Sequence, residues 1–309
     1  MDNNLNFGQK LTLSFLRLFS GKSLKAHYRS AGWISSLMEK TVRYRRDEII
    51  TNLSRSFPEL KYGEIRDLGH RFYRHFANVL VEAVWFSGCH GKKGKGRFLG
   101  QRIIDITNPE VFNAVYGNGR SMVVLNSHMG NWELLGGISY YHADEKAPLD
   151  LPPLEIVVAY KALRSRFWDG VMKALRCGPL EDVEYEGYVE SNLMLRHAVT
   201  HRNDRRCYVF SIDQFPYGNS ARVEVGTFMN QQTVAMSGAA ALACRLGMSV
   251  VYPSWRSRPD GGWYMTFIPI CEDASTETPE TIMRKYYDLI EDDIRKEPES
   301  YLWSHKRWK

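Results

Sequence analysis

The chain has 309 residues, of which 44% are hydrophobic and 25% are charged, and its formal net charge is +6 at pH 7. These proportions are those of a globular protein with a substantial buried core, and they exclude disordered and collagen-like chains. The five cysteines occur singly, a pattern that is typical of a reducing compartment and that argues against a disulfide framework or a zinc ribbon.

The positive charge is concentrated at the amino terminus. Residues 1–46 contain nine Lys or Arg and two acidic residues, an excess of +7. Bulky apolar side chains accompany these cations, among them Leu11, Phe15, Leu18 and Phe19. Such a segment is typical of an interfacial helix on an anionic membrane surface, and an amphipathic helix that covers the core is the alternative. Nucleic acid is not an expected partner, because no known nucleic-acid-binding module is present.

No segment has the roughly 18 to 20 uninterrupted apolar residues that a membrane span requires. The best candidate, residues 233–253, contains Arg245, and the amino terminus is too polar for a signal peptide. We therefore expect a soluble or peripheral protein.

Apolar periodicity predicts the elements in chain order. Apolar residues at three- and four-residue steps predict helices over 47–57 and 64–86, and the glycine-punctuated basic segment 88–100 is interpreted as a solvated connector. Strands are then predicted over 121–126, 154–160, 206–212, 249–254 and 264–268, and helices over 132–141, 165–176, 189–201, 237–246 and 279–296. This alternation predicts an α/β fold with a mostly parallel sheet flanked by helices. We assign residues 1–95 to a helical, membrane-associating region and 96–309 to a continuous α/β core.

His128 and Glu133 lie where the first predicted strand passes into a helix, after the apolar run 121–126. An open α/β sheet presents reactive groups at the carboxyl ends of its strands. A carboxylate that reaches one imidazole nitrogen fixes the tautomer and leaves the other nitrogen free to accept a proton. We therefore expect His128 to be a general base and Glu133 its orienting carboxylate; a structural histidine is the alternative. The spacing does not fit the helical zinc-protease pattern.

Several further stretches share one family's order and spacing. They are Arg43-Tyr44-Arg45-Arg46, Asn52-Leu53, Phe57-Pro58-Glu59, Asp213-Gln214, the run from Phe228 to Ala243, and the terminal Ile294-Arg295, Pro298-Glu299, Leu302-Trp303 and His305-Lys306-Arg307-Trp308. Together with His128 to Glu133, this set resembles the bacterial acyltransferases that add secondary fatty acyl chains in lipid A biosynthesis. The resemblance implies a glycerol-phosphate-acyltransferase-like fold.

The chain departs from the family at a few positions. The long amino-terminal membrane helix of many relatives is replaced by the shorter basic segment. Asn230 stands where a glycine is usual and Ser237 where a threonine is usual. The usual Tyr-Arg pair after the second core strand is Tyr160-Lys161, with Arg164 nearby. These changes bear on the acceptor and the acyl chain more than on the reaction.

The resemblance implies transfer of a fatty acyl chain from an acyl thioester to a hydroxyl of a lipid A precursor or a similar membrane lipid. The implied donor is an acyl carrier protein or acyl-CoA, and the implied location is peripheral, at the cytoplasmic face of the bacterial inner membrane. An acyl carrier protein is acidic and would be attracted to a basic face. Acyl transfer needs a base and charge stabilisation for the oxyanion, and the resemblance implies no metal or cofactor.

Four more residues are candidates for substrate binding. Lys161 and Arg164 are expected to bind the acceptor's phosphate or the donor's phosphopantetheine, with solvated surface charge as the alternative. Asp213 and Gln214 follow a core strand as site residues would, although an Asp in this position also forms turns.

Other functions remain open. Acylation of another lipid, such as an amino-acid lipid or a glycolipid, is the main competitor, and a non-catalytic peripheral lipid-binding protein is another. A serine hydrolase would use Ser127, but no Gly-x-Ser-x-Gly sequence surrounds that residue.

Overall fold

The computed structural model describes residues 5–141, 148–178 and 187–308, and seven strands within them form one sheet. These strands are β1 (Ile104–Ile106), β2 (Met122–Asn126), β3 (Ile156–Tyr160), β4 (Tyr188–Glu190), β5 (Cys207–Ser211), β8 (Ser249–Ser257) and β9 (Trp263–Cys271). Their spatial order is β1-β9-β8-β2-β5-β3-β4, and only the β8–β9 pair of this sheet is antiparallel among the described strands. The predicted mostly parallel α/β fold is confirmed.

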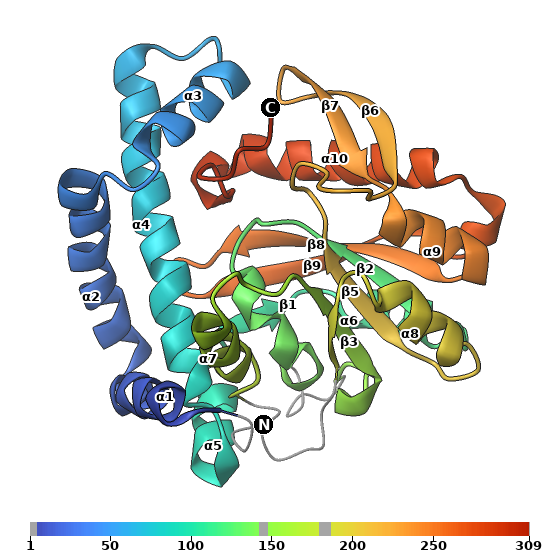
Figure 1. Ribbon diagram of the computed structural model, residues 1–309, viewed down its shortest axis with the longest axis horizontal. Coiled ribbons are helices and arrows are strands. Elements are labelled where there is room, and N and C mark those ends of the chain that lie inside the picture. Colours follow the sequence, from blue (N-terminus) through green and yellow to red (C-terminus); the bar gives the residue numbers. More distant parts are fainter. Residues whose placement is uncertain (1–4, 142–147, 179–186, 309) are drawn as a thin grey trace.

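Helices cover this sheet, as expected for parallel strands whose two faces are both buried. They include α6 (Pro109–Tyr116), α7 (Arg166–Arg176), α8 (Met194–Thr200), α9 (Gly238–Leu246), α10 (Pro279–Lys296) and the 3₁₀ helices η3 (Trp132–Tyr140), η4 (Pro153–Glu155), η6 (Ala274–Thr276) and η7 (Pro298–Ser300). An antiparallel hairpin, β6 (Arg222–Phe228) and β7 (Gln231–Met236), lies beside α10 (Figure 1). The central strand β2 is buried along its whole length, so the core lies around it.

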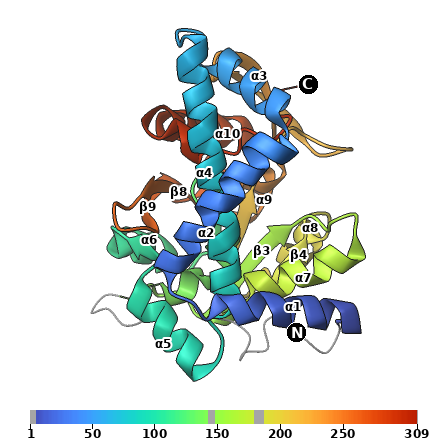
Figure 2. The ribbon, with the colours of Figure 1, turned by 90° about the vertical axis from the view of Figure 1, so that its left-hand side faces the viewer.

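The amino-terminal helices form a layer along one side of the sheet (Figure 1). They are α1 (Phe7–Ser20), α2 (Leu24–Ser36), the π-helix η2 (Leu37–Val42), α3 (Arg46–Ser56), α4 (Tyr62–Ser87) and α5 (Gly91–Gln101). Figure 2 shows α2 lying across α4 with α1 near their lower ends. Leu13 of α1 packs against Val171 and Leu175 of α7, which attaches the first helix to the α/β core. Within the described residues, no helix has both the length and the apolar character needed to cross a bilayer.

Two segments differ from the sequence prediction. The interpretation of residues 88–100 as a connector is wrong, because α5 occupies most of them. Phe98 is buried there, with its ring 5.8 Å from that of Phe86 and 5.4 Å from that of Tyr141. This packing overrides the low helix propensity of the glycines. The predicted helix 189–201 begins instead as β4, because its first residues pair with the edge of β3.

Candidate active site

Strand register brings two polar residues together at the carboxyl edge of the sheet. In the parallel pair β2–β5, Asn126 lies opposite Ser211. His128 and Asp213 each follow their strand by two residues, so the backbone places them at the same level beyond the sheet. Open α/β sheets bind their ligands at this edge.

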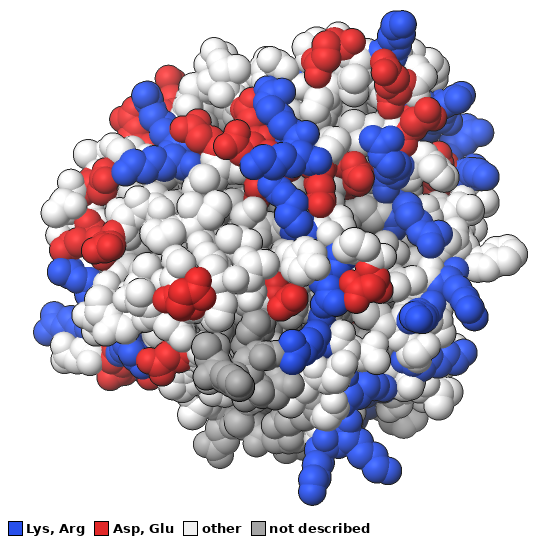
Figure 3. Space-filling view, turned by 180° about the vertical axis from the view of Figure 1, so that it is seen from behind, with Lys and Arg blue, Asp and Glu red and all other residues white. Residues whose placement is uncertain are grey.

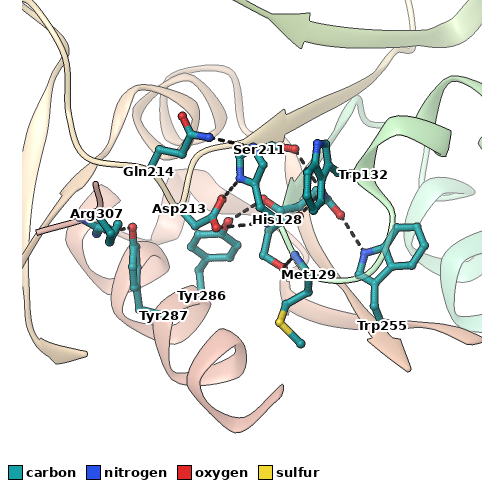
Figure 4. Close-up of polar contacts among 12 residues, drawn as sticks. His128, Met129, Trp132, Ser211, Asp213, Gln214, Trp255, Tyr286, Tyr287 and Arg307 are labelled. Carbon is teal, nitrogen blue, oxygen red and sulfur yellow. Dashed lines mark hydrogen bonds and ion pairs between the residues drawn. The ribbon is translucent and has the colours of Figure 1, made fainter. Parts of the chain in front are cut away.

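Asp213 holds His128 through two hydrogen bonds (Figure 4). Imidazole Nδ1 lies 2.6 Å from Oδ1 of Asp213, and the backbone N–H of His128 donates to Oδ2 at 3.1 Å. Burial of Asp213 opposes its ionisation, but the attraction of His128 and these hydrogen bonds outweigh burial and hold the pKa of Asp213 below its ordinary value. A carboxylate in this position keeps the proton on Nδ1 and leaves Nε2 as the proton acceptor.

Gln214 lies beside the second imidazole nitrogen. Its side-chain nitrogen is 3.1 Å from Nε2 of His128 and donates to it when Nδ1 carries the proton (Figure 4). The ring of Trp132 packs edge-on against the imidazole, with the ring centroids 5.1 Å apart. A hydroxyl substrate that gives its proton to Nε2 must therefore displace the Gln214 amide.

The prediction that Glu133 contacts the imidazole is wrong. Glu133 forms an ion pair with Arg176 of α7 instead: Oε2 accepts from Nε, and Oε1 accepts from Nη2 at 2.9 Å. Burial of Glu133 opposes its ionisation, but Arg176 outweighs burial and holds the pKa of Glu133 below its ordinary value. Arginine binds a carboxylate with two parallel hydrogen bonds, which a neutral imidazole cannot do. Asp213 binds imidazole Nδ1 and so takes the orienting position that was expected for Glu133.

A pocket of about 320 Å³ opens beside the imidazole. Four of the residues expected from the sequence line it, namely His128, Glu133, Lys161 and Gln214. The Lys161 ammonium lies 3.6 Å from the centre of the Tyr217 ring. Arg164 does not line this pocket; it lines a neighbouring hollow between α1 and α7, together with Arg166 and Lys173. An anionic substrate group would thus meet cations in both places.

Ser127 does not face the pocket. Its side chain is fully buried, its hydroxyl lies 3.5 Å from that of Tyr252, and it accepts a hydrogen bond from the N–H of Met129. A nucleophilic serine has to reach its substrate and a base. The structure therefore gives no support to a serine hydrolase.

The carboxyl-terminal segment braces the loop that follows β2. The N–H of Gly130 donates to the carbonyl of Ser300 at 3.2 Å, and Met129 pairs with Tyr301 in an antiparallel bridge. The same segment is held from α3, where the Asn52 amide donates to two of its carbonyl groups at 2.8 Å each. Motif residues from near both ends of the chain therefore act together on this loop.

Three neighbours of the site were not anticipated from the sequence. Trp132 lies between His128 and Glu133 in the sequence, and its position so close to the candidate base is a signal that could have marked it as a neighbour of the site. Arg176 and Tyr301 carry no local signal, because they approach Glu133 and Asp213 from distant parts of the chain. Such contacts depend on how the helices pack.

Gly130→Ala is expected to destabilise the protein. Gly130 has a φ of +60°, and an added Cβ would lie 2.7 Å from the Trp255 ring. Backbone strain and steric overlap in a packed core each cost about 1 to 3 kcal/mol, so a clear fall in melting temperature should follow. Gly119→Ala is the matched control, because Gly119 also has a positive φ (+83°) but open space at the Cβ position. Equal losses in the two variants would contradict a role for the Trp255 contact.

The described residues bring together no group of three His, Cys, Asp or Glu side chains that could hold a metal ion. They do bring a carboxylate-bound histidine to a pocket at the carboxyl edge of a mostly parallel sheet. A histidine held in this way is chemically suited to accept a proton from a group bound in the pocket.

Comparison with protein families gives one match, to the carboxyl-terminal part of the chain. Residues 189–309 match the family model of the bacterial lipid A biosynthesis acyltransferases. The match confirms the resemblance that the sequence motifs indicated, and it supports acyltransferase activity on a lipid A-like substrate. The matched range contains Asp213 and Gln214 and begins after His128. A comparison with curated proteins gave no match.

Proposed function

We propose that the protein transfers a fatty acyl chain from an acyl thioester to a hydroxyl of a lipid A precursor or a similar membrane lipid. The observation that carries this proposal is the His128–Asp213 pair beside a pocket that adjoins an apolar chamber. The family match supports the reaction class. The His128–Asp213 pair supports a role for His128 as the general base. The apolar chamber supports a substrate that carries a hydrocarbon chain.

The apolar chamber measures about 590 Å³ and shares part of its wall with the pocket of His128. The shared residues are Ser191, Phe210, Ile212, Tyr217 and Met236. The far wall is formed by side chains of α8 and α9, including Leu195, Ala239 and Leu242. Burying a methylene group is worth about 0.8 kcal/mol, so a chain in this chamber would be held along its length. An acyl chain bound there would lie next to the pocket of His128.

The residues suggest how the transfer proceeds. Nε2 of His128 takes the proton of the acceptor hydroxyl while the hydroxyl oxygen attacks the thioester carbonyl. Asp213 stabilises the imidazolium that forms. The tetrahedral intermediate collapses to an ester, the carbon–sulfur bond breaks, and the imidazolium returns the proton to the departing thiolate. The Lys161 ammonium in the same pocket would favour the negative charge that develops.

An acidic donor protein suits the charge of this molecule. From behind, Lys and Arg side chains gather along the margin where the amino-terminal helices lie (Figure 3). An acyl carrier protein would be attracted to such a margin, and acyl-CoA would bring its own phosphates to it. The proposed donor is therefore an acyl thioester carried by either of these two molecules.

The outer faces of α1 and α2 suit an anionic membrane surface. Phe7, Leu11, Phe15 and Leu18 of α1 recur at helical spacing, and each is between 59% and 82% exposed. Trp33 of α2 is 83% exposed, and exposed lysines and arginines flank it. An apolar helix face with surrounding cations is typical of interfacial binding. We therefore propose a peripheral location at the cytoplasmic face of the bacterial inner membrane. Residues 1–4, the start of the basic segment 1–46, lie outside the described residues.

The double substitution Leu11→Asp, Phe15→Asp is expected to abolish binding to anionic vesicles, because it places two charges on the face that would enter the lipid. Flotation with vesicles of phosphatidylglycerol and phosphatidylcholine measures this. High salt should weaken the binding of the wild type, because exposed charges are screened beyond about 8 to 10 Å near physiological ionic strength. Leu154→Asp, at an apolar residue that is 56% exposed but lies outside this layer, is the control. Unchanged flotation of the double variant would exclude this face.

Lys161→Ala and Arg164→Ala are expected to remove a preference for phosphorylated acceptors. If these cations hold the acceptor's phosphate, its loss misplaces the hydroxyl, and a displacement of about 1 Å can cost on the order of 100-fold in rate. Slow hydrolysis of the thioester should be spared in Arg164→Ala, because Arg164 lies outside the pocket of His128. Transfer to phosphorylated and dephosphorylated acceptors is compared in each variant, with Arg202→Ala as a control at an exposed cation in another pocket. A wild type that ignores the phosphate would favour a non-phosphorylated acceptor, such as an amino-acid lipid.

The function itself is tested by mass spectrometry of lipids from cells with and without the gene. The expected result is a lipid A species that lacks one ester-linked acyl chain in the absence of the gene. Purified protein should form the same ester from an acyl thioester and the isolated lipid. If lipid A is unchanged and another lipid class changes, the proposed acceptor is wrong, whereas the proposed acyl transfer stands.

A further inference from the structure

A buried carboxyl group lies behind the proposed site and has no part in the proton transfers of the proposed mechanism. Glu82 of α4 is 1% exposed and accepts three hydrogen bonds. Oε1 accepts from the hydroxyl of Tyr28 at 2.8 Å, and Oε2 accepts from Asn131 Nδ2 at 2.7 Å and from Trp263 Nε1 at 2.8 Å. The three donors are uncharged and come from α2, the His128 loop and β9. Glu82 thus joins three parts of the fold at one carboxyl group.

Asn131 passes this contact on to the residues around His128. While its Nδ2 is held by Glu82, its Oδ1 accepts the N–H of Glu133 at 3.1 Å and so caps the first turn of η3. That turn begins with Trp132, whose ring packs against the imidazole. Rotation of the Asn131 amide would break the cap. The orientation of this amide therefore affects where the Trp132 ring lies.

Tyr28 extends the contact to the amino-terminal layer. Its hydroxyl donates to Glu82 and accepts the N–H of Gly262 at 2.8 Å, so both of its hydrogen-bonding roles are used. Tyr28 belongs to α2, the helix that also carries the exposed Trp33. A path of hydrogen bonds thus runs from α2 through Glu82 to the His128 loop.

We propose that Glu82 is a positioning residue for acyl transfer: it orients Asn131, and through Asn131 the turn against which His128 packs, and it ties that turn to α2 through Tyr28. This inference rests on the proposed function. A buried carboxyl group is costly unless its hydrogen bonds are made. Burial outweighs the three hydrogen bonds, so the pKa of Glu82 lies above its ordinary value. The role assigned to Glu82 depends on those hydrogen bonds and not on its charge.

Three substitutions test the proposal in steady-state kinetics over a range of substrate concentrations, well below the melting temperature. Glu82→Ala removes all three hydrogen bonds and should lower kcat by about 10- to 100-fold with little change in KM, because misplacing a catalytic group acts on the chemical step. Glu82→Gln keeps one oxygen for Asn131 and Trp263 and can donate to Tyr28, so its kcat should stay within about 3-fold of the wild type. Tyr28→Phe removes the hydrogen bonds of the Tyr28 hydroxyl to Glu82 and from Gly262 but leaves those of Asn131 and Trp263 to Glu82, and it should lower kcat by an intermediate factor.

Tyr73→Phe is the matched control. The Tyr73 hydroxyl also belongs to the amino-terminal layer, but it donates to the carbonyl of Tyr44 at 2.7 Å and not to Glu82. If Glu82→Ala and Tyr28→Phe lower kcat no more than Tyr73→Phe does, the positioning role is overturned. A Glu82→Gln variant as slow as Glu82→Ala would also overturn it, because hydrogen bonding would then not explain the effect.

A readout without activity separates this proposal from the proposed function. The indole N–H of Trp132 donates to Glu133 at 3.2 Å, and its NMR signal reports the first turn of η3. The signal should move in Glu82→Ala and in Tyr28→Phe and stay in place in Tyr73→Phe. If the wild type transfers no acyl chain, the proposed function is overturned. The spectral test still shows whether Glu82 is linked to the turn of Trp132. If the signal does not move but the enzyme is active, the proposed link from Glu82 to the turn of Trp132 is overturned and the proposed function stands.

Discussion

His128→Ala is expected to abolish acyl transfer while the protein remains folded. The substitution removes Nε2, the one nitrogen of the Asp213-bound imidazole that is placed to take a proton from a substrate in the pocket. General-base assistance contributes about 10²- to 10⁴-fold in rate, so turnover should fall by that factor relative to the wild type. The protein should stay folded with some loss of stability, because the buried Asp213 loses its hydrogen bond to the imidazole but still accepts the backbone N–H of residue 128. Turnover of an acyl thioester and thermal melting measure the two effects.

His128→Asn is the companion variant, because it keeps a polar side chain next to Asp213 without a base. It should be as inactive as His128→Ala. Glu133→Ala should lose less activity than either, since Glu133 contacts Arg176 and not the imidazole. A folded His128→Ala protein with near-full activity would exclude the proposed mechanism.

Asp213→Asn is expected to lower kcat by up to about 10⁴-fold, the loss that the same change of the orienting carboxylate causes in the serine-protease triad. The amide can still accept the backbone N–H of His128 through its oxygen. Its NH₂ group then faces Nδ1 and donates to it, so the imidazole carries its proton on Nε2 and cannot act as a base there. The substitution changes no more than one heavy atom of the side chain, so folding should be largely kept.

The pH dependence of stability gives an independent check on Asp213. Its pKa in the folded protein lies below the ordinary value of 3.8, so its stabilising contribution is complete above that value and is lost as the pH falls through the lower, folded-state pKa. The melting temperatures of wild type and Asp213→Asn should therefore differ at neutral pH and converge in strongly acidic solution. A difference that does not depend on pH would contradict an ionised Asp213. Full activity of Asp213→Asn would show that another group orients the imidazole.

Local patterns in the sequence are sufficient to predict the class of fold and the neighbourhood of the proposed site. The apolar run 121–126 and the helical periodicity of 279–296 are such patterns, and the structure confirms them as β2 and α10. Polar residues directly after apolar runs predict the carboxyl edge of a parallel sheet, which is where His128 and Asp213 lie. The types of these two residues and their place beyond the strands therefore follow from the sequence alone.

Which groups meet depends on tertiary packing. The sequence predicted Glu133, five residues from His128, as the orienting carboxylate, whereas the parallel register of β2 and β5 brings in Asp213 from 85 residues away. Glu133 is drawn to Arg176, because the packing of α7 places a permanent cation beside it. Sequence distance does not encode such pairings, since strand order and helix packing depend on burial of the whole core. For the same reason, only the folded chain shows that the apolar face of α1 points outward and that the apolar chamber adjoins the pocket of His128.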